Sequence, residues 1–105
     1  EIGSPDELRL RSSVNGETWQ DSTTAEMVFD VATIVSFASR TITLEPGDII
    51  ATGTPAGVGH YQLPPRYLVG GDVMRCEIDG IGSISNAIVD ELPRSEDHAA
   101  AAGLG

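Results

Sequence analysis

The sequence predicts a mostly-β fold of the α+β class, in which two hairpins flank one central helix. Two stretches alternate apolar and polar residues, and each meets a turn-forming pair, Asn15-Gly16 or Asp79-Gly80. Twelve glycines and six prolines among 105 residues indicate many turns, which favours short strands over long helices. A single stretch between the two hairpins shows helical periodicity.

The first hairpin is predicted over residues 8–20. Alternate positions from Leu8 to Val14 would share one face of the leading strand. Asn15-Gly16 then tolerates positive φ at both central turn positions, as a tight hairpin turn requires. Residues 17–20 would form the returning strand.

A helix is expected after the first hairpin, with more than one possible start. Thr23 stands three residues before Glu26 in the spacing of a capping box, and Thr24 is an alternative cap. Asp30 would cap a shorter helix. The pattern ends at residues 39–41. One helical face carries an apolar stripe that we interpret as core packing, made of Met27, Val31, Ile34, Val35 and Ala38.

Two similar short motifs occur in the second half of the chain, at residues 47–50 and 71–74. Each places Gly-Asp directly before an apolar stretch. The first is expected to begin a buried strand at Ile49 that runs to Thr54. The second begins a hairpin with strands over residues 73–78 and 82–89.

We therefore expect one domain over residues 1–90. Residues 91–105 are acidic and then rich in alanine, which predicts a disordered tail. The chain begins with Glu1 in loop-like sequence, so we expect a processed or partial chain whose fold is completed by other residues.

Charge and composition exclude several classes of function. Sixteen acidic and six basic residues give a net charge of −10, which repels phosphate backbones and argues against nucleic-acid binding. No apolar run approaches the roughly 20 residues of a membrane span, so no membrane partner is expected. A single cysteine, Cys76, excludes an intrachain disulfide and fits a cytoplasmic protein.

The densest chemical signal is the loop over residues 51–59, Ala-Thr-Gly-Thr-Pro-Ala-Gly-Val-Gly. Glycines let backbone N–H groups approach a ligand closely, and threonine hydroxyls both donate and accept hydrogen bonds. The segment suits a carboxylate or enolate oxygen of a small substrate, although a glycine-rich loop can also serve only as a turn. It lacks the lysine pattern of a phosphate-binding loop.

Other candidate residues favour structural interpretations. His60 could be a general base or a metal ligand beside the loop, but an exposed histidine next to Tyr61 is the favoured interpretation. His98 is expected to be uninvolved, and Cys76 is interpreted as a structural thiol because no histidine partner is evident. No Gly-x-Ser-x-Gly nucleophile elbow is present.

The acidic residues do not form a recognisable metal site. Asp48 and Asp72 follow turn glycines, where they would accept hydrogen bonds from local backbone N–H groups. Glu77 and Asp79 share one face of a strand and are expected to be exposed to solvent. We therefore assign no metal ligand and no catalytic residue in this chain.

Over residues 5–90 the sequence resembles the fumarylacetoacetate hydrolase family, in the C-terminal portion of the catalytic domain. The segment 43–59 matches the most distinctive sequence motif of that family. The other matching residues are Val14-Asn15-Gly16-Glu17, Gln20-Asp21, Thr24, Met27, Tyr67-Leu68, Gly71-Asp72-Val73, Glu77-Ile78-Asp79-Gly80-Ile81-Gly82 and Asn86.

The resemblance implies a mixed β-roll, a homodimer and a divalent cation, Mg²⁺ or Mn²⁺. It also implies hydrolysis, isomerisation, hydration or decarboxylation of small 2-oxo or 1,3-dicarbonyl acids, as in aromatic catabolism. Thr54 resembles the family's substrate-contacting threonine, with Gly53 and Thr52 beside it. The family's metal carboxylates, lysine and His-Glu dyad precede this region and have no counterpart here. The alternative is a truncated structural or binding module without turnover.

Overall fold

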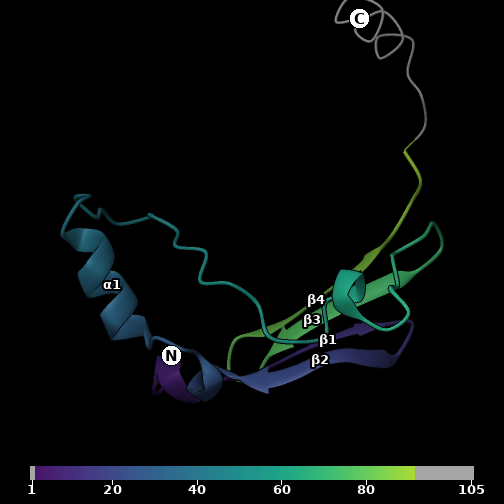
Figure 1. The fold of residues 1–105 in the computed structure, drawn as a ribbon, viewed down its shortest axis with the longest axis horizontal. Helices are drawn as coiled ribbons and strands as arrows, with labels where there is room; N and C mark the ends of the chain where they lie inside the picture. The colour runs from purple at the N-terminus through teal and green to yellow at the C-terminus, as the bar shows by residue number, and fades with distance from the viewer. Residues whose placement is uncertain (1, 92–105) are drawn as a thin grey trace, which may run out of the picture.

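A four-stranded antiparallel sheet forms the largest element of the computed structural model, which describes residues 2–91 (Figure 1). The sheet order is β2-β1-β3-β4, so the two hairpins join through β1 and β3. The strands are β1 (Arg9–Val14), β2 (Glu17–Thr23), β3 (Val73–Ile78) and β4 (Gly82–Ala87). Both predicted hairpins and the mostly-β class are confirmed, whereas the mixed β-roll stays a prediction.

The first hairpin turns as the Asn-Gly pair predicts. Asn15 has φ of +53° and Gly16 has φ of +81°, the conformation that few residues other than asparagine and glycine adopt readily. The strand β4 ends two residues before the predicted limit at residue 89.

A β-bulge interrupts β2 at Trp19. Ser12 pairs with Gln20, whereas Ser13 pairs with Thr18, so Trp19 is an extra residue without a partner on β1. Consecutive side chains of a regular strand point to opposite faces, and a bulge changes that alternation locally. This irregularity lies where β2 meets the loop over residues 51–59.

The helix α1 spans Val31–Ser39 and begins at the later of the expected caps. The Asp30 carboxylate accepts a hydrogen bond from the backbone N–H of Thr33 at 2.8 Å. Thr23 instead caps a single 3₁₀ turn over Thr24–Glu26, with its hydroxyl accepting from the N–H of Ala25. The shorter of the two predicted helices is therefore correct.

The interpretation of the helical stripe as core packing is wrong within the described residues. Val31, Ile34 and Ala38 are half-buried, Val35 is 40% exposed, and Met27 precedes the helix. Figure 1 shows the reason, because α1 lies apart from the sheet and no described element covers it. The periodicity is real, but its packing partner is not among residues 2–91.

The predicted buried strand from Ile49 to Thr54 is also wrong. The segment forms no strand, and the Ile49 side chain is 93% exposed. A strand needs a neighbouring strand to satisfy its backbone hydrogen bonds, and none of the four described strands pairs with this segment.

The two Gly-Asp motifs each form a turn, and both turns have the same pattern of hydrogen bonds. The N–H of Asp48 donates to the carbonyl of Glu45, and its carboxylate accepts from the N–H of Glu45 at 2.8 Å. Asp72 makes the same pair of bonds with Val69, at 3.1 and 3.0 Å. The glycine before each aspartate has φ of +95° or +97°. Both aspartates thus serve local backbone donors, as predicted.

Two other predictions concern the ends of the chain and membranes. The predicted tail over residues 91–105 lies, apart from Glu91, outside the described residues, and so does His98. Among residues 2–91, no helix has the length and hydropathy needed to cross a membrane.

Candidate functional site

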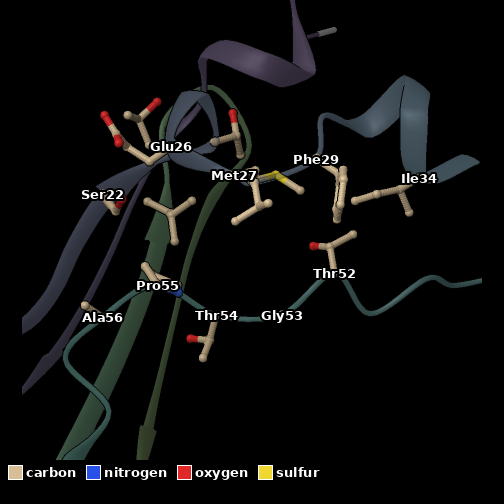
Figure 2. A pocket seen from close by; sticks show the side chains of 14 residues that line it. Ser22, Glu26, Met27, Phe29, Ile34, Thr52, Gly53, Thr54, Pro55 and Ala56 are labelled. Carbon is tan, nitrogen blue, oxygen red and sulfur yellow. The ribbon is translucent and has the colours of Figure 1, made fainter.

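A pocket of about 510 Å³ opens between the 51–59 loop, the end of β2 and the start of α1. Thr52, Gly53 and Thr54 are among its lining residues, and their role in substrate binding stays a prediction. Figure 2 shows Met27, Phe29 and Ile34 across from these residues, with the Thr52 side chain directed toward them and the Thr54 side chain directed to the opposite side of the loop. The structure thus brings the three predicted residues together at one cavity.

Gln20 connects the sheet to the 51–59 loop. Its amide nitrogen donates to Thr54 Oγ1 at 2.8 Å and to the carbonyl of Pro55 at 2.9 Å. The Ser12 hydroxyl donates to the amide oxygen of Gln20 at 2.8 Å. Nothing in the sequence indicated this role, because Gln20 and Thr54 are 34 residues apart and meet only in the folded hairpin.

Two glycines allow the loop to lie directly against β2. A Cβ atom on Gly57 would overlap the backbone oxygen of Trp19, and one on Gly59 would overlap the backbone oxygen of Arg66. The Gly59 position would also bring a Cβ to 2.9 Å from the Trp19 ring. These glycines are therefore needed for close packing as well as for turning.

Arg66 connects the end of the loop to the same hairpin, because its backbone N–H donates to the carbonyl of Gly59 at 2.8 Å. Its guanidinium binds Glu17 through two hydrogen bonds of 2.9 and 2.7 Å and lies 4.7 Å from the centre of the Trp19 ring. The hydrogen bonds from Arg66 lower the pKa of Glu17. Gln62 adds a bond from its amide nitrogen to the carbonyl of Gly57 at 3.0 Å.

His60 lies outside the pocket wall and is exposed, as the favoured interpretation predicted. Its Nδ1 is 2.8 Å from the hydroxyl of Tyr67, and its ring meets Tyr61 edge-on at 4.9 Å between centroids. His60, Tyr61 and Tyr67 therefore form an exposed aromatic cluster.

The carboxylates of Glu77 and Asp79 form ion pairs. Both bind Arg11, at 2.9 and 3.4 Å, and Glu77 also binds Arg75 at 3.3 Å. Asp79 is exposed as predicted, whereas Glu77 is half-buried because two arginines cover it. Across residues 2–91 there is no group of three His, Cys, Asp or Glu side chains that could hold a metal ion. The described side chains therefore do not fit a divalent cation by themselves.

Residues 1–89 match the family model for the C-terminal domain of fumarylacetoacetate hydrolase. A mitochondrial oxaloacetate tautomerase from Xenopus laevis is 49% identical over 88 residues, which cover 84% of this chain and 28% of that protein. The structure is also similar to fumarylacetoacetate hydrolase from the psychrophile Exiguobacterium antarcticum. That match has a TM-score of 0.81 at 47% identity and covers 85% of this chain and 32% of that one.

A third similar protein is maleylpyruvate hydrolase from Sphingobium sp. SYK-6, in complex with manganese(II) ion and pyruvate. Its TM-score is 0.76 at 37% identity, over 87% of this chain and 32% of that one. This chain thus spans about a third or less of each of these relatives. The family model covers both hairpins and the 51–59 loop. The relatives are hydrolases and a tautomerase. The chain belongs to the fumarylacetoacetate hydrolase family.

Proposed function

We propose that the full-length protein carrying this chain acts on a small 2-oxo acid, and that the 51–59 loop binds one of the oxygen atoms of that substrate. The observation that carries the proposal is the pocket wall formed by Thr52, Gly53 and Thr54. The relatives support the substrate class, because oxaloacetate and maleylpyruvate are both 2-oxo acids.

The chemistry of a 2-oxo acid explains what such a wall contributes. Moving a proton from the carbon beside the oxo group, or breaking the bond beyond that carbon, places negative charge on an enolate oxygen. Preorganised hydrogen-bond donors stabilise that charge. The Thr52 and Thr54 hydroxyls are such donors on opposite sides of the loop, and Gly53, with φ of +98°, leaves the backbone between them uncovered by any Cβ. The wall therefore suits tautomerisation and carbon–carbon hydrolysis equally.

We further propose that the full-length protein uses Mg²⁺ or Mn²⁺, held by residues other than those described. The net charge of −10 supports this, since it would repel a dianionic substrate unless a cation offset it. The manganese-bound relative supports it as well.

A second candidate applies to the 105-residue chain alone, namely a module of the same fold that binds without turnover. The observation that favours it is a formed pocket wall without a metal-binding group among residues 2–91. The mixed β-roll, the homodimer and the cytoplasmic location remain proposals for the full-length protein.

The proposal is tested by replacing Thr54 with valine in the full-length protein, which removes the hydroxyl and keeps the side-chain volume. We expect kcat/KM for oxaloacetate tautomerisation or maleylpyruvate hydrolysis to fall roughly 10- to 100-fold, because a hydrogen bond to a charged oxygen is lost. Thr54→Ser is the matched control and should keep most of the activity.

Unchanged kinetics in Thr54→Val with both substrates would contradict the proposed role of the loop. The wild-type protein is also assayed before and after chelation, because full activity without a divalent cation contradicts the proposed cofactor.

A further inference from the structure

We propose that Asn15 is a site of spontaneous deamidation, that its hydrogen bonds to the start of β3 hold this reaction back, and that the folded structure cannot accommodate the product. Asn15 and Gly16 form the exposed turn between β1 and β2, and neither residue lines the pocket. Deamidation at this turn is therefore separate from the proposed function.

The reaction of an Asn-Gly pair is intramolecular. The backbone nitrogen of Gly16 attacks the side-chain carbonyl carbon of Asn15. A bond forms between these two atoms, the bond from that carbon to the side-chain nitrogen breaks, and ammonia leaves with the proton of the attacking nitrogen. Water then opens the cyclic imide at either carbonyl group and gives aspartate or isoaspartate. Glycine favours the attack because no Cβ atom shields its nitrogen or restricts its backbone, whereas Asn86 precedes an alanine.

Hydrogen bonds occupy both ends of the Asn15 side-chain amide. Its nitrogen donates to Asp72 Oδ1 at 2.9 Å, and its oxygen accepts from the backbone N–H of Val73 at 2.8 Å. The backbone N–H of Asn15 also donates to the carbonyl of Val73 at 2.9 Å. Ring closure folds the side chain back onto the peptide bond with Gly16, and that movement breaks both side-chain bonds. The reaction is therefore limited to molecules in which this junction has opened.

The aspartate product would place a carboxylate oxygen where the side-chain nitrogen of Asn15 now lies. The Asp72 carboxylate accepts from that nitrogen and also from the backbone N–H of Val69 at 3.0 Å, so it is held in place. Two carboxylate oxygens would then face each other at hydrogen-bond distance without a donor between them. Like charges this close repel each other, so the aspartate product destabilises the junction.

The isoaspartate product changes the main chain instead, because it moves the side-chain CH₂ group into the backbone of the turn. Asn15 and Gly16 are the only residues between Val14 and Glu17, which pair across the hairpin. A turn this short joins two strands with only a few backbone geometries, and an added backbone atom does not fit them. Both products therefore weaken the first hairpin, either at its turn or at its contact with the start of β3.

The first test follows deamidation of the full-length protein by peptide mass spectrometry, in native buffer and in concentrated denaturant. In denaturant we expect Asn15 to react faster than Asn86. In the folded protein Asn15 should react roughly 10-fold or more slowly than in denaturant, because the hydrogen-bonded junction must open first. An equal or higher rate in the folded protein would overturn the inference.

The second test removes one of the protecting bonds. Asp72→Ala should raise the deamidation rate of Asn15 in the folded protein about 3-fold or more and leave the rate in denaturant unchanged. Asp48→Ala is the matched control, because Asp48 makes the same turn bonds with Glu45 but none with Asn15. Equal rates in the two variants would contradict protection by Asp72. If Asp72→Ala does not fold, the comparison of folded and denatured wild-type protein still decides whether the fold protects Asn15.

The third test concerns the product. Asn15→Asp reproduces the aspartate form, and we expect it to lower the unfolding temperature of the full-length protein. The loss should be smaller in an Asp72→Asn background, because that change supplies an amide that donates to the new carboxylate. Equal losses in both backgrounds would show that repulsion from Asp72 does not act on the product, and would overturn that part of the inference.

Discussion

The glycines of the 51–59 loop satisfy different physical requirements at positions only a few residues apart. Gly53 has open space around it and needs to be glycine because its φ is +98°. Gly59 has no positive φ, yet it is buried between the Trp19 ring and the backbone of Arg66. One residue provides backbone freedom and the other permits close contact.

We predict that Gly59→Ala destabilises the full-length protein by about 1–3 kcal/mol, because the added methyl group overlaps backbone that cannot rotate away. Gly3→Ala is the control, since nothing lies within 4 Å of a Cβ built there. Chemical denaturation of both variants checks the difference. Equal stability of the two would show that the loop can separate from Trp19 at little cost.

Single-residue chemistry was predictable only where it is local. Thr52 and Thr54 were predicted to bind substrate because hydroxyls and glycines adjoin one another in the sequence, and that role stays a prediction. The part played by Gln20 was not predictable, since its partners come from β1 and from a loop 34 residues away. The same holds for Trp19 and its contact with Arg66.

At the scale of secondary-structure elements, Asn15 and Asp72 connect the first hairpin to the start of β3. The side chain of Asn15 donates to Asp72 at 2.9 Å and accepts from the N–H of Val73 at 2.8 Å. The backbone N–H of Val69 and the Asn15 amide lower the pKa of Asp72 below its ordinary value of 3.8. The ionised carboxylate therefore stabilises this junction.

This shift predicts how stability depends on pH. A lowered pKa in the folded state means that Asp72 contributes stability above its ordinary pKa and loses it as pH falls through the lower, folded-state value. The Asp72→Asn variant should thus be less stable than wild type at neutral pH, and the gap should narrow in strong acid. Unfolding temperatures measured from neutral to acidic pH check this. A gap of constant size would mean that the charge of Asp72 is not involved.

Elements defined by local signals were predicted well, and those that need a partner were not. Asn15-Gly16 and Asp79-Gly80 mark their hairpins, and Asp30 caps α1 through its own backbone neighbourhood. The apolar run at Ile49-Ile50 looked like a buried strand, yet a strand and a buried face both depend on a second surface. The described residues do not supply one.

At the scale of the whole molecule, apolar side chains remain uncovered on the described structure. Val14 is the only hydrophobic residue among residues 2–91 that is buried. Several large side chains are mostly exposed, among them Phe29, Phe37, Ile49, Ile84 and Val89. Burial of such groups is the main force that stabilises a fold, so the described residues gain little of it by themselves.

We therefore predict that the isolated 105-residue chain unfolds without a sharp transition and binds a dye for exposed apolar surface, whereas the full-length protein unfolds cooperatively. Circular dichroism during heating and dye fluorescence measure the two properties. A single cooperative transition in the isolated chain would show that its sheet is stable on its own.

The bulge at Trp19 also limits how the chain can vary in length. Deleting one residue from β2 between Glu17 and Gln20 would restore regular pairing with β1 and would turn one of Trp19 and Gln20 away from the loop. An exchange of side chains at the exposed Thr18 changes only a surface. We therefore expect β2 to tolerate substitutions at exposed positions such as Thr18. A change in its length would instead disrupt the contacts between β2 and the 51–59 loop, which forms a wall of the pocket.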